Sequence, residues 1–207
     1  MNILVLVSGS GTNLQALINA ERAGRLTGTK KPGVSGHIAA VVSDRPCVYA
    51  LERARAAGIP ALTEEPDSRL SKIERQEELS DRLLRIAQTY RAGLIVLAGF
   101  LSILRGKIIG EYAGRIINLH PSLLPKYGGP GMYGAKVHEA VLAAGDKESG
   151  CTVHLVDEGT DTGPILFQRK VPVLPEDTAE SLAERIHREE HIAIVEAAAL
   201  MLNKEVL

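Results

Sequence analysis

The sequence has few of the features that nucleic-acid-binding proteins use. Its 207 residues include no Trp, and aromatic residues make up only 3%, so the stacking platforms that single-strand binders need are scarce. Positive charge is not in excess either, because 24 Lys and Arg residues stand against 25 Asp and Glu residues. A protein without an excess of positive charge does not attract a polyanion such as a nucleic acid strongly. We therefore expect small-molecule partners and no nucleic acid.

Cysteines and long apolar runs are also scarce. Cys47 and Cys151 are the two cysteines, whereas disulfide scaffolds are short and cysteine-dense. The apolar run from Ile3 to Val7 lacks a basic leader and is shorter than a signal-peptide core of roughly 7–15 residues. No apolar run approaches the ~20 residues of a membrane helix. These absences predict a soluble, cytoplasmic protein without membrane contact.

The order of apolar segments predicts strands that alternate with helices. Asn2 to Ser8 is a continuous β-branched and leucine run, typical of a parallel strand covered on both faces. Further strands are predicted at His37–Val42, Ile59–Leu62, Gly93–Ala98, Arg115–Leu119, Gly150–Val156 and Ile165–Val173. Helices are predicted at Leu14–Ala23, after Pro46 through Ala57, around Leu79–Tyr90, in a short stretch before Arg115, at Ala135–Ala144 and up to about Asn203. We expect an α/β fold, doubly wound around a mostly parallel sheet, with the C-terminal strands and helix completing a cleft.

The last helix is predicted to begin at Asp177, with Asp177 as N-cap and Glu180 as its partner three residues on. Before it, Pro121 to Gly134 is predicted to be a long loop rich in proline and glycine. Long ordered loops of this kind are usually functional. We expect this loop to form part of a site or a lid over one.

The first candidate site is the glycine turn between the first strand and the first helix, Gly9 to Leu14. Exposed backbone N–H groups and the helix dipole favour a phosphate there. Leu14 stands where a dinucleotide fingerprint needs its third glycine, and the Lys of a P-loop is absent. A single phosphate monoester fits better, and the alternative is an ordinary tight turn without a ligand.

The second candidate is the pair Asn118 and His120, at the carboxyl end of a predicted parallel strand, where open α/β sheets bind ligands. Residues two apart on a strand share a face, so an amide and an imidazole would converge. The amide would stabilise an oxyanion and the imidazole would move a proton. Asp161, in the acidic turn 157–164, would raise the pKa of His120 if it faced the ring. The alternative is that these residues merely cap their turns.

Two further patterns suggest other chemistry. His187, Glu190 and His191 match the H-x-x-E-H zinc pattern, but a third ligand is needed and Glu196 is the sole downstream candidate. We therefore expect no metal. Cys151 opens a predicted strand after Gly150, so we interpret it as a small buried residue rather than a nucleophile. Without a covalent nucleophile, direct transfer between two bound substrates is favoured.

Four motifs together resemble one enzyme family. They are Ser8 to Gln15 (SGSGTNLQ), Leu97 to Phe100 (LAGF), Asn118 to Pro125 (NLHPSLLP) and Asp161 to Pro164 (DTGP). In this collinear order the chain resembles the phosphoribosylglycinamide formyltransferases of purine biosynthesis, within the formyltetrahydrofolate-dependent transferases, from Met1 to about Ala199. The resemblance implies a Rossmann-like formyltransferase fold and transfer of a formyl group from 10-formyltetrahydrofolate, the co-substrate, to the amine of 5-phosphoribosylglycinamide.

The resemblance also implies a role for individual residues. The chain would be a single domain, 1–207, with a phosphate-binding half (1–117) and a catalytic and folate-site half (118–207), acting as a monomer or homodimer. The expected residues are Asn118, His120 and Asp161 for catalysis, Gly11, Thr12, Asn13 and Glu190 for the ribonucleotide, and Arg69, Leu101, Ser102, Ile103, Leu104 and Asn118 for the folate.

Two segments depart from the family pattern. The family usually has Met-Arg-Ile-Leu where this chain has Leu101 to Leu104, so a cationic contact is absent at Ser102, and Lys126 is the candidate substitute. The loop from Gly128 to Tyr133 replaces a shorter, His-bearing form. Three alternatives stay open: a hydrolase of formyltetrahydrofolate with the same Asn, His and Asp, a non-catalytic nucleotide-binding module, and a zinc hydrolase.

Overall fold

The computed structural model describes residues 1–28 and 33–203. The strands are β1 (Asn2–Val7), β2 (His37–Ser43), β3 (Ala61–Thr63), β4 (Ala92–Leu97), β5 (Ile116–His120), β6 (Glu148–Leu155) and β7 (Ile165–Pro172). The helices are α1 (Thr12–Arg22), α2 (Tyr49–Ala56), α3 (Lys72–Thr89), α4 (Lys107–Glu111), α5 (Ala135–Ala143) and α6 (Ala179–Met201). The predicted strands lie within one or two residues of these bounds.

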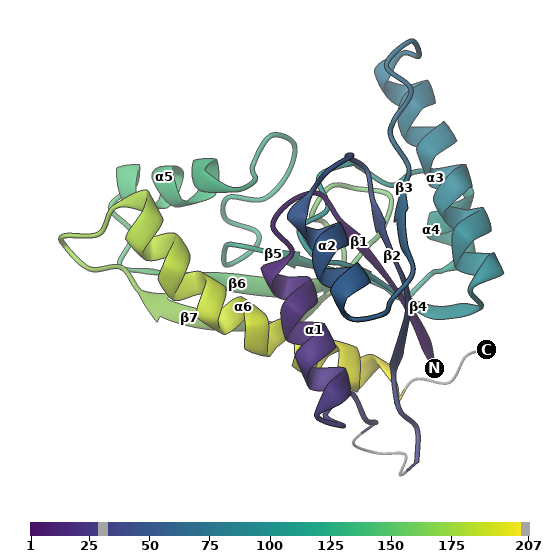
Figure 1. Cartoon of the computed structure of the whole chain (residues 1–207). Coiled ribbons are helices and arrows are strands. Elements are labelled where there is room, and N and C mark those ends of the chain that lie inside the picture. The colour runs from purple at the N-terminus through teal and green to yellow at the C-terminus, as the bar shows by residue number, and fades with distance from the viewer. Residues whose placement is uncertain (29–32, 204–207) are drawn as a thin grey trace.

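The seven strands form one sheet in the order β3-β2-β1-β4-β5-β6-β7 (Figure 1). The first five are parallel to their neighbours, while β6 runs antiparallel to β5, and β7 antiparallel to β6. The chain proceeds outward from β1 to β3 and then returns to β4 on the other side of β1. This reversal creates a crevice at the carboxyl ends of β1 and β4, where ligands bind in such folds. The doubly wound, mostly parallel sheet is thus confirmed.

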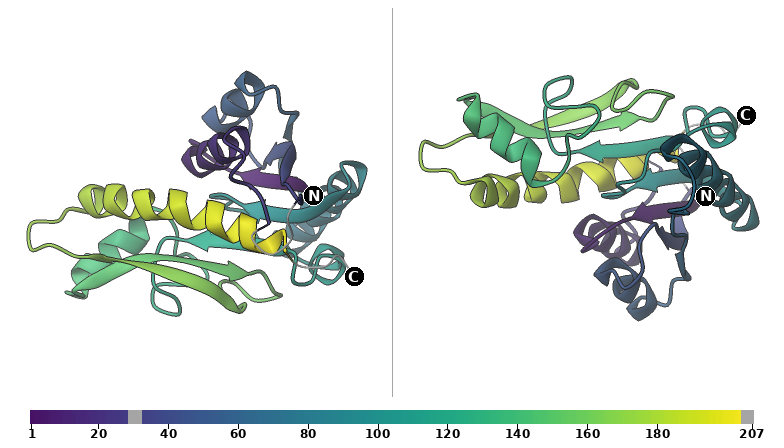
Figure 2. Two further views of the ribbon diagram at one scale, coloured as in Figure 1. Left: turned by 90° about the horizontal axis from the view of Figure 1, so that it is seen from below. Right: turned by 90° about the horizontal axis from the view of Figure 1, so that it is seen from above.

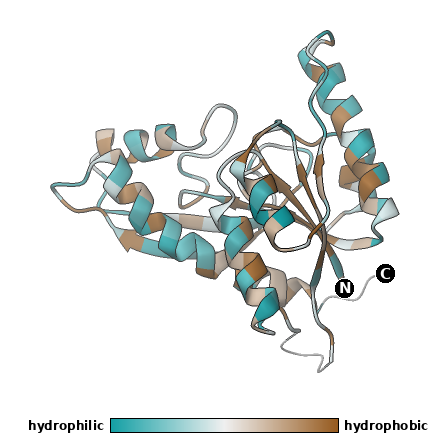
Figure 3. Ribbon diagram, viewed as in Figure 1, coloured by the Kyte–Doolittle hydropathy of each residue, from teal (hydrophilic) through white to brown (hydrophobic). Residues whose placement is uncertain are grey.

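Each face of the sheet has its own hydrophobic core. In β1, Ile3, Val5 and Val7 pack into the core beneath α1, α2 and α6, and Leu4 and Leu6 pack into the core beneath α3 and α4. All five side chains are fully buried, which at about 1.5–3 kcal/mol each makes this strand a major source of stability. Figure 2 shows helices on both sides of the sheet, and Figure 3 shows hydrophobic residues along the central strands.

Helix α6 begins one residue later than predicted. Thr178 is the N-cap: its hydroxyl accepts the Ser181 N–H at 3.3 Å, and the Ser181 hydroxyl accepts the Thr178 N–H at 3.0 Å. Asp177, the predicted cap, instead accepts the Ser181 hydroxyl at 2.7 Å and pairs with Arg185 at 2.6 Å. The prediction was wrong because an arginine two turns along the helix competes for this carboxylate, which leaves the capping box to Thr178.

Candidate active site

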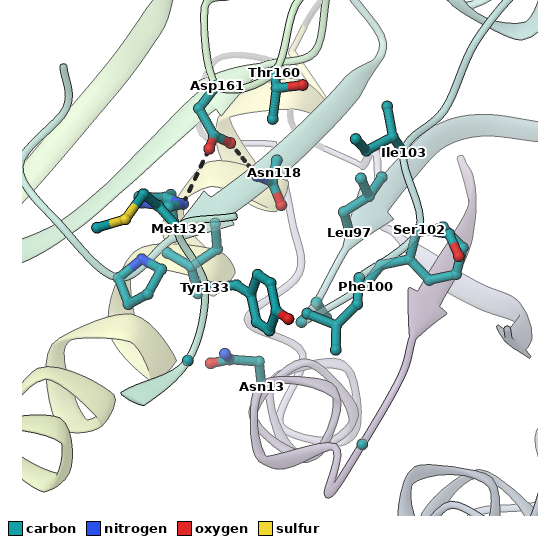
Figure 4. A pocket seen from close by; sticks show the side chains of 18 of the residues that line it. Asn13, Leu97, Phe100, Ser102, Ile103, Asn118, Met132, Tyr133, Thr160 and Asp161 are labelled. Atoms are coloured by element: carbon teal, nitrogen blue, oxygen red, sulfur yellow. Dashed lines mark hydrogen bonds and ion pairs between the residues drawn. The ribbon is translucent and has the colours of Figure 1, made fainter. Parts of the chain in front are cut away.

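A pocket of about 420 Å³ lies in the crevice at the carboxyl ends of β1, β4 and β5 (Figure 4). Most of its walls come from four parts of the chain that are far apart in sequence: the turn after β1, the segment after β4, the end of β5 with the loop that follows it, and the turn between β6 and β7. Single residues of α5 and β6 and two residues of α6 complete the lining. The first two walls are tied together, because the Ser8 N–H donates to the Gly99 carbonyl at 3.0 Å and the Leu101 N–H to the Ser8 hydroxyl at 2.8 Å. The predicted glycine turn and the predicted strand-end pair therefore face one cavity.

Asn118, His120 and Asp161 meet in this pocket. Asn118 and His120 leave β5 on the same face, while Leu119 between them packs into the core. The Asp161 Oδ2 atom lies 3.5 Å from His120 Nδ1, and its Oδ1 atom lies 3.4 Å from the Asn118 amide nitrogen. Figure 4 shows the Asp161 carboxylate pointing at the Asn118 amide. The structure thus brings together the three side chains chosen from the sequence.

Backbone contacts hold the carboxylate and the imidazole in place. Asp161 has a left-handed backbone, with φ of 58°, and its Oδ2 atom accepts the Gly129 N–H at 2.9 Å. His120 Nε2 lies 2.7 Å from the Tyr127 carbonyl oxygen. Because a carbonyl only accepts, Nε2 carries a hydrogen, and Nδ1 is the nitrogen that faces Asp161. The long loop 121–134 therefore orients both groups.

Asp161 acts on the pKa of His120 in the predicted direction, but burial has the larger effect. Burial lowers the pKa of His120 below its ordinary value, and the nearby Asp161 carboxylate, which acts to raise it, does not offset this effect. The prediction considered only the charge of Asp161, because the sequence does not show how deeply the fold buries His120, which is 4% exposed. For Asp161, burial acts to raise the pKa, but His154, His120 and the Gly129 N–H outweigh it, so the pKa is lowered.

His154 belongs to the same cluster and was missed in the sequence. It pairs with Asn118 across the antiparallel β5–β6 ladder, and its Nε2 atom lies 3.1 Å from the Asn118 amide nitrogen and 3.6 Å from Asp161 Oδ1. Its Nδ1 atom lies 2.8 Å from the Leu155 carbonyl oxygen. A histidine between Val153 and Leu155, inside a predicted strand, was the available signal. Two more histidines, His138 and His187, also line the pocket.

The turn Gly9 to Asn13 forms the opposite end of the pocket. Helix α1 begins at Thr12, so the first backbone N–H groups of the helix have no partner within it. The Asn13 side-chain amide donates to Glu190 Oε2 at 3.2 Å, while its Oδ1 atom is buried and has no partner among the described residues. The predicted ribonucleotide residues Gly11, Thr12, Asn13 and Glu190 are therefore neighbours.

Glu190 is buried, with 5% exposure, on the pocket side of α6. Burial raises its pKa, against the effects of His187 and of the Asn13 amide. The carboxylate lies 3.8 Å from His187 Nε2, whereas His191 Nε2 is buried without a partner among the described residues. In the parts of the chain that the structure describes, no three His, Cys, Asp or Glu side chains are grouped as metal ligands.

The segment Leu101 to Leu104 lines the pocket, but two predicted cations do not. Ser102 donates its hydroxyl hydrogen to Asp44 Oδ2 at 2.7 Å. The suggestion that Lys126 replaces the missing arginine is wrong. Its Nζ atom pairs with Asp146 Oδ2 at 3.0 Å beside a separate cavity. Arg69 also lies outside the pocket lining; it pairs with Asp67 at 2.7 Å, and its side chain is 87% exposed.

The interpretation of Cys151 as a buried residue is confirmed. Its side chain is fully buried in the core, and burial raises its pKa to about 12. A thiol with such a pKa is not ionised at neutral pH and is inert as a nucleophile.

The polar side chains of the pocket are an amide, imidazoles and carboxylates, which suit proton transfer and oxyanion stabilisation.

Gly11 is the residue at which the glycine turn tolerates no side chain. It has φ of +73°, and a Cβ atom there would lie 2.6 Å from Ala50 Cβ and 2.8 Å from Ala50 Cα. We expect Gly11→Ala to lower the free energy of unfolding by about 2–4 kcal/mol, measured by urea denaturation, because strain and overpacking add. Gly24→Ala is the control: it has φ of +66° but open space around it, so only about 1–2 kcal/mol is expected. Equal losses in the two variants would contradict the packing argument.

Comparison with known proteins shows the family of this chain. The model of the formyl transferase family matches residues 1–198, and the chain belongs to that family. Phosphoribosylglycinamide formyltransferase of Escherichia coli (strain K12) is 39% identical over 191 residues, which cover 92% of this chain and 82% of that protein. The crystal structure of glycinamide ribonucleotide transformylase 1 from Symbiobacterium toebii aligns with a TM-score of 0.83 and 42% identity, covering 98% of this chain and 87% of that one.

Two other relatives are longer than this chain. The trifunctional purine biosynthetic protein adenosine-3 of Drosophila melanogaster is 44% identical over 201 residues, which cover 97% of this chain but only 14% of that protein. A formyltetrahydrofolate deformylase from Pseudomonas syringae aligns with a TM-score of 0.83 and 25% identity, over the full length of this chain and 62% of that one.

None of the helices in the described ranges combines the length and the apolar character needed to cross a membrane.

Proposed function

We propose that this chain transfers the formyl group of 10-formyltetrahydrofolate to the amine of 5-phosphoribosylglycinamide. The observation that carries the proposal is the convergence of Asn118, His120 and Asp161 at one side of a pocket whose other end is a helix N-terminus suited to a phosphate. The relatives named phosphoribosylglycinamide formyltransferase support it, since one of them matches over 82% of its own length. The activities that the longer trifunctional relatives carry outside the matched part are no part of the proposal.

In this mechanism Asn118 stabilises the oxyanion. The amine attacks the formyl carbon, and the carbonyl oxygen gains negative charge as the tetrahedral intermediate forms. The Asn118 amide nitrogen has two hydrogens; one faces His154 Nε2 at 3.1 Å and the other makes the longer, 3.4 Å contact with Asp161. The longer contact is the weaker one, so we infer that this hydrogen turns to the oxyanion when substrate is bound.

His120 supplies the proton that the folate nitrogen needs as the carbon–nitrogen bond to it breaks. His120 lines the pocket; its Nδ1 atom faces Asp161, while Nε2 is occupied by the Tyr127 carbonyl. The negative charge of Asp161 favours the imidazolium over the neutral ring. The attacking nitrogen loses a proton in the same reaction, so the products are the formamide and tetrahydrofolate, with no net gain or loss of protons.

The two substrates would occupy opposite ends of the pocket. Backbone N–H groups of Gly11, Thr12 and Asn13 hold the phosphate, and Glu190 lies toward the rest of the ribonucleotide. Leu101 to Leu104 form a wall for the folate, and Arg69, which lies outside the pocket lining, would contact only a part of that molecule that extends beyond the pocket. We further infer a single domain over 1–207, with halves 1–117 and 118–207, that acts in the cytoplasm as a monomer or homodimer and requires no metal ion.

The closest alternative is hydrolysis of formyltetrahydrofolate, which the likeness to a deformylase favours. Both reactions would use the same three side chains and differ in the acceptor, an amine or water. Purified protein should convert 10-formyltetrahydrofolate to tetrahydrofolate only when 5-phosphoribosylglycinamide is added, and it should release no formate. Formate release at the same rate without the amine would overturn the proposal in favour of a hydrolase.

A further inference from the structure

Arg53, on helix α2, lies behind the glycine turn and contacts it directly. Its Nε–H group donates to the Ser10 carbonyl at 2.9 Å, and its Nη1 group donates to Gln15 Oε1 at 3.1 Å. Its guanidinium group also lies over the Tyr49 ring, 4.7 Å from the ring centroid. With contacts on three sides, this side chain is held in one orientation against the turn.

Helix α2 fixes two successive carbonyl groups of the turn. The Ala50 N–H donates to the Gly9 carbonyl at 3.1 Å, and Arg53 binds the Ser10 carbonyl. In the described residues the one cis peptide bond is Leu124–Pro125, so both turn peptides are trans. In a trans peptide the C=O and the following N–H point in opposite directions. The N–H groups of Ser10 and Gly11 are therefore turned away from α2.

The pocket lies on the side to which these N–H groups point. Gly9 to Asn13 line it, whereas no residue of α2 does. Gly11 permits this arrangement, because its missing Cβ lets Ala50 approach the turn closely. Successive backbone N–H groups that converge in this way form an anion-binding concavity. The fixed carbonyl groups thus prepare the turn for a phosphate before it binds.

We propose that Arg53 is a positioning residue for the phosphate of the ribonucleotide. It holds the Ser10 carbonyl away from the pocket, which aims the Gly11 N–H at the phosphate, and it places a positive charge behind the turn. This inference rests on the proposed function and deepens it. Arg53 lies outside the pocket lining, and it would increase the affinity of the site for the phosphate group of the ribonucleotide.

The test compares substrates with and without the phosphate. For Arg53→Ala we expect kcat/KM for 5-phosphoribosylglycinamide to fall about tenfold, as is typical when a hydrogen bond to a charged group is removed. For the phosphate-free glycinamide riboside we expect no change between the variant and the parent protein. Calorimetry with inorganic phosphate should show the same tenfold loss of affinity. Arg53→Gln keeps an N–H donor without the charge and should lose less.

Arg55→Ala is the matched control, because this arginine lies on the same helix, pairs with Glu52 and is half exposed. It should bind and turn over both substrates like the parent protein. If Arg53→Ala and Arg53→Gln leave phosphate affinity unchanged, or if they weaken the riboside as much as the ribonucleotide, Arg53 has no phosphate-specific role. A parent protein that binds phosphate but transfers no formyl group would overturn the proposed function and leave the role of Arg53 intact.

Discussion

The His120→Ala variant should lose at least about 100-fold in kcat, because it has no group to protonate the departing folate nitrogen and general acid catalysis is typically worth that much. KM for both substrates should change little, since the His120 ring is held by Tyr127 and Asp161 at the pocket wall and its proton is needed only as the bond breaks. Steady-state kinetics at saturating concentrations of both substrates measures the effect.

Two further variants separate chemistry from folding in this experiment. His120→Asn keeps a polar side chain of smaller size in the buried position and should lose activity to a similar degree. His37→Ala is the control, because His37 is an exposed histidine that pairs with Glu21 far from the pocket, and it should retain full activity. Near-normal kcat in a folded His120→Ala protein would remove His120 from the mechanism.

The parts of the site that the sequence revealed are those set by local geometry. Asn118 and His120 are two residues apart on a strand, so their common face follows from the period of the strand alone. The glycine turn follows an apolar strand and precedes a helix, and this order places it at the crevice of a doubly wound sheet. Both inferences need only neighbouring residues, and in both the side chains or turn residues line the pocket.

What the sequence did not reveal depends on contacts between distant strands. His154 enters the site because β6 pairs antiparallel with β5 in a register that sets it opposite Asn118. The sequence of each strand alone predicts neither the direction nor the register of their pairing. Tyr127 takes part through its backbone carbonyl, which no side-chain pattern signals. The lowered pKa of His120 is likewise a consequence of burial by the assembled fold.

Asp161 is an intermediate case. Its turn was recognisable as acidic, and Asp161 was chosen over Asp157 and Glu158 because the turn-forming residues Thr160, Thr162 and Gly163 flank it. The structure distinguishes them, because Asp161 faces His120 and Asn118 whereas Asp157 accepts the Thr162 hydroxyl at 2.7 Å within its own turn. The role of Asp161 therefore follows from its contacts in the folded chain, where its backbone is left-handed, with φ of 58°.

Asp161→Asn should also lower kcat by about 100-fold or more and should change the pH profile in a defined direction. The carboxylate raises the pKa of His120 against the effect of burial, so its removal lowers that pKa further. A general acid acts only while protonated, and activity is lost as pH rises through its pKa. The alkaline limb of the kcat profile should therefore move to lower pH in the variant, by an amount that pH-dependent kinetics measures directly.

The same variant distinguishes an electrostatic role of Asp161 from a purely structural one. Asparagine keeps an oxygen that accepts the Gly129 N–H, which binds Oδ2 at 2.9 Å in the parent, so the loop should stay in place. Glu158→Gln is the control, since this exposed carboxylate of the same turn does not line the pocket, and its pH profile should match the parent. If Asp161→Asn lowers kcat equally at every pH, the carboxylate does not tune the imidazole, and its contribution lies in positioning Asn118.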